Sequence, residues 1–462
     1  MVMKRAISRL VIFLVIPFII ISFTAKASPA FQKPAIADET CKGLELKRPV
    51  SLPRMIVLPL QSENHDFHNE TGLALHFYLS NILALHTGLD EFWFSWRMKS
   101  LFPHKDDLFA YIRGSTPLSN PGLQAEKQGI RYLLQGKVMK TGKAVKVFFD
   151  LTDIQRSAHT MKTAIEIKDP GRLDLFALDF IRWLKACGLS MSRDQAEKAI
   201  WKEEISFTGL SSLGKALEDY YAHSYCPPDD MLQMESFNSA VNLAPGSYMA
   251  ADLLGWAFYK NRRYSEAQSQ FISSLKINPA GAGALSGLIW CAVMAGHEDE
   301  GYRLGRIRAR LRNEPEGYRL AIIANRFGNI ASKAGERDRS IRMYEKAAGC
   351  NPWKSIYLTK LASEYSKINK YEKALRVLDT PPPLPWPKME KERLQIKRAQ
   401  ILVRYAMFLK KSEKYKEALS RLEQALEIET NKKASDIIRH MEDIRAEMQD
   451  KKRGRGRPND NL

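Results

Sequence analysis

A spacing of about 34 residues constrains this chain more than any other feature, because it repeats small and aromatic residues at fixed offsets. Segments that begin at Ala321, at Ser355 and near Ala399 share their offsets with a first segment, and residues 214–247 and 282–315 are weaker copies. The pattern predicts stacked helical hairpins, since small residues let two helices approach closely and aromatic residues fill the gap to the next hairpin. The first and clearest segment contains Tyr248, Leu254, Gly255, Phe258, Ala267, Phe271, Ser274 and Pro279.

In these offsets, residues 214–430 resemble the tetratricopeptide-repeat (TPR) family. The resemblance implies an all-α superhelix, a helical-hairpin solenoid whose concave face is lined by the first helix of each hairpin. It also implies a protein-protein interaction scaffold that binds an extended peptide or a helix of another protein. We therefore expect a binding protein and not an enzyme.

The resemblance further indicates which side chains of the first helices face the concave surface. Most of them are basic or amide side chains, which predicts capture of an acidic or carboxylate-bearing segment. The alternative is that they form ordinary solvated faces of a basic protein. Some family members clamp a terminal carboxylate with Lys and Asn, but here Asn occupies both offsets and the Lys is missing. The expected residues are Asn325, Arg326, Asn329, Lys333, Lys360, Lys367, Arg404, Lys410 and Lys411, with Trp256 and Tyr259 as aromatic anchors.

Residues 54–188 show a different pattern, in which strand-like and helix-like runs alternate. This order predicts a small α/β sandwich. The runs 56–59, 129–138 and 145–153 resemble the TolB amino-terminal-domain-like module, a non-catalytic part of some bacterial regulators that carry TPR repeats. The second strand is more aromatic than in that family, and the loop after it is longer. We expect strands at 55–60, 92–96, 132–138, 144–151 and 160–167, and helices at 70–87, 120–129 and 172–187.

The N-terminus has the pattern of an export signal. Lys4, Arg5 and Arg9 precede an apolar run from Leu10 to Phe23, and small residues follow at 25–27. We expect residues 1–27 to be a signal peptide and the mature chain to start near Ser28, in the periplasm or cell envelope. An uncleaved N-terminal membrane anchor is the alternative, although the run is shorter than a spanning helix needs.

Charge and cysteine content restrict the class of partner. The formal net charge of +19 favours an acidic protein, an anionic membrane surface, a cell-wall polymer or nucleic acid, and the charge alone does not choose among them. Five cysteines are few for a disulfide framework, and their odd number leaves at least one unpaired in a monomer. The His65-to-Glu70 loop lacks a metal-site spacing, and no catalytic motif is present, so we expect no metal, no cofactor and no catalysis.

The C-terminal tail raises a rival function. Arg455 and Arg457, with their basic neighbours, resemble an AT-hook, whose arginines enter a narrow minor groove of DNA. The export signal argues against nucleic-acid binding, and a disordered tail attracted to anionic lipid or polymer is the other interpretation. The proline-rich run at 381–387 is expected to be a stiff connector, with a polyproline ligand as the alternative.

Three functions remain open at this point: an envelope scaffold or adaptor, a sensory or regulatory module that works with a separate membrane-bound regulator, and a nucleic-acid-binding protein. The expected domains are a signal peptide at 1–27, a proline-rich lead-in at 28–53, the α/β domain at 54–188, a linker helix at 189–213, TPR-like repeats at 214–430, a capping helix at 431–450 and a basic tail at 451–462.

Overall fold

A computed structural model describes most of the chain, in two compact units. The described residues up to Glu314 form the first unit, and the described residues from Pro315 onwards form the second. The leader, the lead-in, the expected strand at 92–96, the expected helix at 120–129 and the 381–387 connector lie outside the described residues. The described ranges are 55–62, 69–83, 99, 101–114, 130–141, 144–156, 159–189, 204–227, 229–312, 314–352, 354–379, 388–428 and 433–455.

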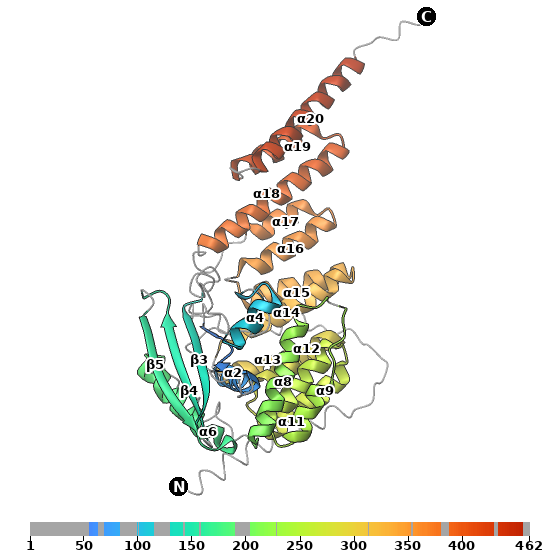
Figure 1. Cartoon of the computed structure of the whole chain (residues 1–462). Helices are drawn as coiled ribbons and strands as arrows, with labels where there is room; N and C mark the ends of the chain where they lie inside the picture. Colours follow the sequence, from blue (N-terminus) through green and yellow to red (C-terminus); the bar gives the residue numbers. More distant parts are fainter. Residues whose placement is uncertain are drawn as a thin grey trace, which may run out of the picture. The chain divides into compact units, whose positions relative to one another are not determined.

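A mixed sheet forms the start of the first unit (Figure 1). Its strand order is β1-β3-β4-β5, and the short β2 pairs with β3. β1 is parallel to β3, whereas β3, β4 and β5 form an antiparallel meander in which Thr141 lies opposite Ala144. The strands expected at 132–138, 144–151 and 160–167 are therefore present. The strands are β1 (Met55–Val57), β2 (Gln61–Ser62), β3 (Tyr132–Thr141), β4 (Ala144–Asp153) and β5 (His159–Ile167).

One face of this sheet is covered by helices. Every second residue of β4 is buried, as expected when only one face of an antiparallel sheet is packed. Phe149 of β4 contacts three aromatic rings of α6 (Leu173–Ala186), with centroids 5.1–6.1 Å apart. The Tyr78 hydroxyl of α2 (Asn69–Leu83) donates a hydrogen bond to the Leu173 carbonyl. A further helix, α4 (Lys105–Ile112), forms where the sequence predicted only a long loop.

Three helical hairpins follow in the first unit. The first helices of the second and third hairpins, α10 and α12, begin 34 residues apart, which is the spacing predicted from the sequence. The first hairpin begins at Phe207, inside the segment expected to be a linker helix. The helices are α8 (Phe207–His223) with α9 (Glu235–Leu243), α10 (Tyr248–Lys260) with α11 (Tyr264–Ile277), and α12 (Ala282–Ala295) with α13 (Glu298–Arg312).

The Tyr248 hairpin shows why the repeat needs its small and aromatic residues. A Cβ atom on Gly255 of α10 would lie 2.6 Å from the Phe271 ring of α11, so only glycine allows the two helices this approach. The Ser274 hydroxyl of α11 donates to the Tyr248 carbonyl across 2.9 Å and closes the other end of the hairpin. The packing expected of a TPR-like hairpin is therefore present.

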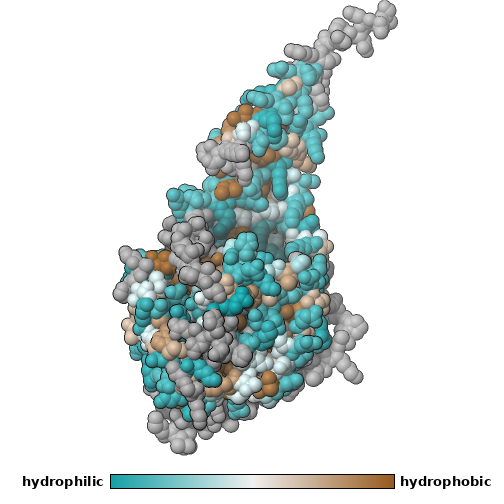
Figure 2. All heavy atoms as spheres, in the orientation of Figure 1, coloured by the Kyte–Doolittle hydropathy of each residue, from teal (hydrophilic) through white to brown (hydrophobic). Residues whose placement is uncertain are grey.

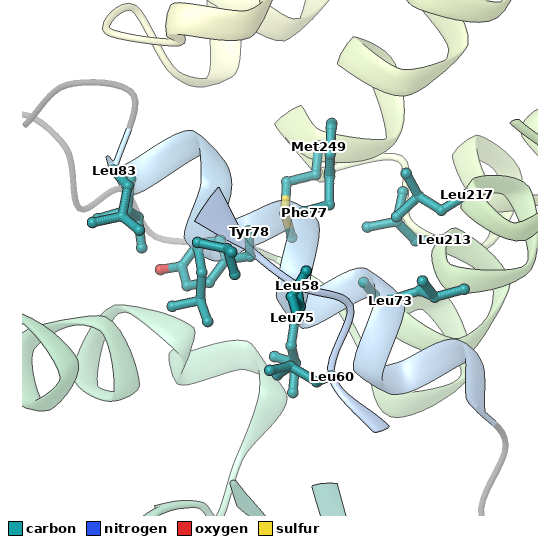
Figure 3. Close-up of a cluster of buried hydrophobic side chains, with 14 of the residues drawn as sticks. Leu58, Leu60, Leu73, Leu75, Phe77, Tyr78, Leu83, Leu213, Leu217 and Met249 are labelled. Carbon is teal, nitrogen blue, oxygen red and sulfur yellow. The ribbon is translucent and has the colours of Figure 1, made fainter. Parts of the chain in front are cut away.

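Helix α2 joins the sheet to the repeats of the first unit. Phe77 and Tyr78 are both almost fully buried, and one continuous hydrophobic core extends from β1 to the start of α12. Figure 3 shows Phe77 beside Met249 of α10, and Leu73 facing Leu213 and Leu217 of α8. A Cβ atom on Gly214 of α8 would overlap the backbone of α2, so the two helices touch at this glycine.

The second unit contains three more hairpins and a terminal helix. Its hydrophobic core is separate and extends from α15 to α20. The terminal helix continues to Arg455, into the segment expected to be a disordered tail. The helices are α14 (Glu316–Lys333) with α15 (Arg337–Cys350), α16 (Ser355–Lys367) with α17 (Tyr371–Leu378), α18 (Lys388–Lys411) with α19 (Tyr415–Ile428), and α20 (Lys433–Arg455). Among the described helices, none combines the length and apolar character that crossing a bilayer requires.

Candidate partner-binding surface

The basic residues expected on the concave surface come from the first helices of the second unit. Asn325, Arg326, Asn329 and Lys333 lie on α14, Lys360 and Lys367 lie on α16, and Arg404, Lys410 and Lys411 lie on α18. Trp256 and Tyr259 lie on α10, in the first unit, and are therefore considered separately below.

Lys360 is the centre of a polar cluster that joins α14 to α16. Its Nζ atom donates hydrogen bonds to Asn325 Oδ1 and to Asn329 Oδ1, each across 2.8 Å. The Tyr344 hydroxyl of α15 donates to the same Asn329 oxygen across 3.0 Å, and the Lys360 ammonium lies 5.8 Å from the Tyr344 ring centroid. The two Asn residues therefore orient the lysine without neutralising its charge.

The charge on Lys360 has no acidic counterpart within the described part of the chain. Its hydrogen-bond partners are neutral amides, and Lys360 is half-buried. Burial lowers the pKa of Lys360, and the nearby positive charge of Arg326 lowers it further. A half-buried cation beside a second cation attracts an anionic group more strongly than a fully solvated lysine does.

A second pair of cations lies on α18. Lys397 is half-buried and Arg404, seven residues later on the same helix, is exposed, and the described residues provide no carboxylate at ion-pair distance from either of them. Burial lowers the pKa of Lys397, and the charges of Arg404 and Lys367 contribute to the shift. We name the surface formed by Asn325, Arg326, Asn329, Lys360, Lys397 and Arg404 the basic face.

Lys397 was missed by the sequence analysis. The fourth repeat was expected to start near Ala399, whereas α18 begins at Lys388, directly after the proline-rich run. Lys397 therefore belongs to the first helix of this hairpin and lies two helical turns before Arg404. The signal that could have located it is Pro387, because helices commonly begin immediately at or after a proline.

Two of the expected cations already have partners in the protein. Lys367 donates to Glu364 Oε1 across 2.6 Å and to the Ser332 hydroxyl across 3.0 Å. Burial alone would raise the pKa of Glu364, but the hydrogen bonds from Lys367 and Ser332 hold it below its usual value. Lys410 forms an ion pair with Glu447 of α20 at 2.6 Å. Lys367 and Lys410 therefore stabilise the array, whereas Lys333 and Lys411 are exposed side chains.

The aromatic anchors of the first unit are half-buried and packed on each other. The Trp256 and Tyr259 rings are 5.6 Å apart, and Trp256 also contacts the Phe271 ring at 5.3 Å. On the same helix Met249 and Asp252 are covered almost completely, and Asp252 lies with Asn81 of α2 beside Gly283 of α12. Part of the inner face of the first unit is therefore occupied by its own helix α2.

Burial of Asp252 creates an unusual acid in this interior. Burial raises the pKa of Asp252 to about 8, although a hydrogen bond from the Trp256 side chain lowers this pKa to a smaller extent. One carboxyl oxygen, Oδ1, has no hydrogen-bond partner among the described residues. Asp252 in the folded protein is therefore mainly protonated at neutral pH.

The remaining candidate residues are at the ends of the described chain or outside it. Arg455 is the last residue of α20, and Arg457 lies outside the described residues. The His65-to-His68 part of the loop considered for metal binding also lies outside them, while Glu70 accepts a hydrogen bond from the Ser211 hydroxyl of α8 across 2.6 Å. In the described ranges no group of three or more His, Cys, Asp or Glu side chains could hold a metal ion.

In Figure 2 the repeats of the second unit present mainly hydrophilic residues, interrupted by small separate hydrophobic patches. Among the described residues of this unit, the exposed large hydrophobic side chains are Ile396, Phe408 and Ile438. Three such side chains are too few to form the contiguous apolar patch that marks a hydrophobic docking site.

No protein-family model matches this chain, and no curated protein matches it. Among solved structures it is similar to YrrB, described as a TPR protein with an unusual peptide-binding site, at 12% identity over 45% of this chain and 100% of that chain, with a TM-score of 0.26. It is also similar to a thermophilic TPR protein of Thermus thermophilus, at 18% identity over 43% of this chain and 98% of that chain, with a TM-score of 0.21. A third similar structure is pilF of Pseudomonas aeruginosa, at 14% identity over 50% of this chain and 94% of that chain, with a TM-score of 0.26. TM-scores this low carry no argument, so the repeat architecture rests on the hairpins themselves.

Proposed function

We propose that this protein is a non-catalytic interaction scaffold that binds an acidic segment of a protein partner on the basic face of its second unit. The observation that carries the proposal is the Lys360 ammonium, which is half-buried on two neutral amides with Arg326 nearby. A solvated surface lysine needs no such support. The arrangement fits a residue that receives a negative charge from outside the chain.

The geometry of Lys360 also specifies what it would bind. A lysine ammonium has three hydrogen-bond donors, and two of them are used by Asn325 and Asn329. The third remains for a carboxylate oxygen of the partner, which would form a charge-assisted hydrogen bond. Arg326 would add a second positive charge to the same carboxylate.

Lys397 and Arg404 extend this recognition onto the next hairpin. They lie on α18, whereas Lys360 lies on α16 and Arg326 on α14, so the cations are distributed over three successive first helices. An extended partner with several acidic residues would contact the cations of all three helices. A compact single anion would engage only one pair.

Export to the periplasm or cell envelope is part of the same proposal. The basic residues, the apolar run and the small residues at 25–27 support it. The α/β region would then position or sense a second partner, as its resemblance to the TolB amino-terminal-domain-like module suggests. Intact-mass analysis of the protein recovered from cell fractions tests export, since a start near Ser28 supports it, an intact Met1 in the membrane fraction supports the uncleaved anchor, and an intact Met1 in the cytoplasmic fraction argues against export.

Binding to defined acidic peptides tests the scaffold function. We expect the full mature chain to bind fluorescent Glu- and Asp-rich peptides and to lose most of that affinity in the triple variant Arg326→Gln, Lys360→Gln, Arg404→Gln. The matched control, Arg342→Gln, Lys391→Gln, Lys416→Gln, removes three exposed cations elsewhere on the second unit. Equal losses in both variants would mean that net charge alone attracts the peptide and that the basic face has no special role.

A further inference from the structure

Strand β5 forms one edge of the sheet in the first unit (Figure 1). It pairs with β4 from His159 to Ile167, and within the described residues no other strand pairs with it. Its 9 residues exceed the length of an average strand, and they contain neither a proline nor a bulge. Such an edge offers its outer backbone N–H and C=O groups to another strand, and proteins usually protect it.

The side chains of β5 alternate between the two faces of the sheet. Ile165 and Ile167 are buried on the face that α6 covers. Lys162, Ala164 and Glu166 are exposed on the opposite face. Two charges of opposite sign therefore lie on either side of a small residue, each two positions away from it.

We propose that β5 pairs antiparallel with β5 of a second copy of this chain, about a two-fold axis at Ala164. A two-fold interface is self-complementary, so each contact between two different residues occurs twice. With the axis at Ala164, Lys162 of each copy lies opposite Glu166 of the other, and opposite charges at such positions stabilise a strand pair. The sheets of the two copies then form one continuous sheet.

Charge selects this register over its neighbours. An axis at Lys162 places two lysines opposite each other, and an axis at Glu166 does the same with two glutamates, which is unfavourable in both cases. An axis at Thr163 or at Ile165 leaves Glu166 opposite an uncharged residue. Of these five registers, only the one centred on Ala164 places unlike charges directly opposite each other.

The charges of β4 extend the same pattern inward from the edge. Asp150 lies opposite Lys162 and forms an ion pair with it at 3.6 Å, and Lys146 lies opposite Glu166. A row across the two sheets therefore reads Lys146 and Glu166 from one copy, then Lys162 and Asp150 from the other, and the sign alternates at every step. Lys162 is 72% exposed, so a second carboxylate can approach it from the open side.

The covered face contributes apolar contacts to the same register. Met161 lies opposite Ile167 of the other copy, and Thr163 lies opposite Ile165. Met161 and Thr163 are half-buried, so a second copy covers them further. One strand pair buries less surface than a standard interface, and the formal net charge of +19 on each copy opposes association. The dimer is therefore weak and depends on concentration and salt.

Complementary charge reversal tests the interface. Lys162→Glu leaves acidic residues at both positions and Glu166→Lys leaves basic ones, so each variant alone should dimerise about 10- to 100-fold more weakly than the wild type. An equimolar mixture of the two should recover most of this loss, because every opposed pair again has unlike charges. Sedimentation velocity of the full chain over a concentration series measures the dissociation constants. A variant that failed to fold could not recover on mixing.

A cysteine cross-link tests the register. Directly opposed residues of an antiparallel pair have Cα atoms about 4.5–5.5 Å apart, which a disulfide can span. Ala164→Cys should therefore join two copies at position 164 when oxidised glutathione accepts the two electrons, and peptide mapping identifies the bond. The matched control is Thr160→Cys, exposed on the same face. It should not join the copies, because position 160 lies opposite position 168.

Three results would overturn the inference. They are a chain that stays monomeric at the highest concentration, a dimer that both charge reversals leave unchanged, and equal cross-linking at positions 160 and 164. If β5 instead receives a strand of a different protein, the first of these results is expected. None of the measurements involves an acidic peptide, so the proposed scaffold function keeps its own test.

Discussion

The inner faces of the two units differ although the same kind of hairpin builds both. In the first unit Met249 and Asp252 of α10 are almost fully buried against α2, and the cover is mainly apolar. In the second unit Lys360 is half-buried on two Asn side chains, and Arg326 and Arg404 are exposed. The comparison shows that a repeat framework fixes the helix geometry but leaves the binding surface to a few first-helix residues. One inner face serves internal packing, and the other is the face on which we propose that the partner binds.

Removing a large side chain from the core between α2 and the hairpins of the first unit should have the largest effect on stability. Phe77 of α2 is 1% exposed, so Phe77→Ala should reduce the free energy of unfolding of the first unit by about 3–5 kcal/mol. The control Leu243→Ala, at a position 49% exposed, should change it by less than about 0.5 kcal/mol. Urea denaturation followed by tryptophan fluorescence measures both. Equal stability of the two variants would show that α2 does not form part of this core.

Replacing the buried Asp252 by a neutral residue should stabilise the first unit by an amount that depends on pH. The pKa of Asp252 is raised by burial from 3.8 to about 8 in the folded state, so its contribution to stability is intact below pH 4 and is lost as the pH rises towards 8. Asp252→Asn should therefore gain stability over the wild type by up to about 1.4 kcal/mol for each pH unit in that interval. Denaturation at pH 5 and at pH 8 checks this. A gain that is the same at both values would contradict a raised pKa.

Neutralising the central lysine should weaken recognition on the basic face. Lys360→Gln should lower the affinity for an acidic peptide by about 10- to 100-fold, because it removes a charge-assisted hydrogen bond. Lys333→Gln, at an exposed position of α14, is the matched control and should change the affinity less than about threefold. Fluorescence anisotropy at two salt concentrations measures both variants. A similar loss in the control would assign the effect to overall charge.

The smallest expected effect has opposite signs for stability and for binding. Lys397→Gln should weaken peptide binding by a few-fold and should also stabilise the second unit by about 0.5 kcal/mol, because it removes a charge that burial disfavours and relieves repulsion from Arg404 and Lys367. Thermal unfolding and anisotropy on the same sample check the two signs. A variant that lost both stability and affinity would indicate a structural role for Lys397.

The sequence was most informative where structure depends on local pattern. Hairpins such as that of Tyr248 could be predicted because Gly255, Phe271 and Ser274 occupy offsets that a single hairpin requires. The strands β3, β4 and β5 could likewise be predicted from the strand-like runs at 132–138, 144–151 and 160–167. In both cases the residues that interact are close in sequence or repeat at a fixed period.

Long-range packing could not be read from the sequence. The contact of α2 with α8 joins residues more than a hundred positions apart, such as His76 and Tyr221, whose side chains are hydrogen-bonded across 2.8 Å. No periodicity links them. The same holds for Lys397, which lies on a first helix because α18 begins at Lys388 and not near Ala399.

The burial of α2 also bears on how such a chain could change in length over evolution. A hairpin of the second unit rests mainly on its neighbours, so duplication or loss of one hairpin there keeps the pattern of contacts. In the first unit α2 contacts α8 and also lies beside α10, so an inserted hairpin would displace one helix from it. Homologues that differ in repeat number should therefore differ after Pro315, while the segment from β1 to α12 keeps a constant number of helices.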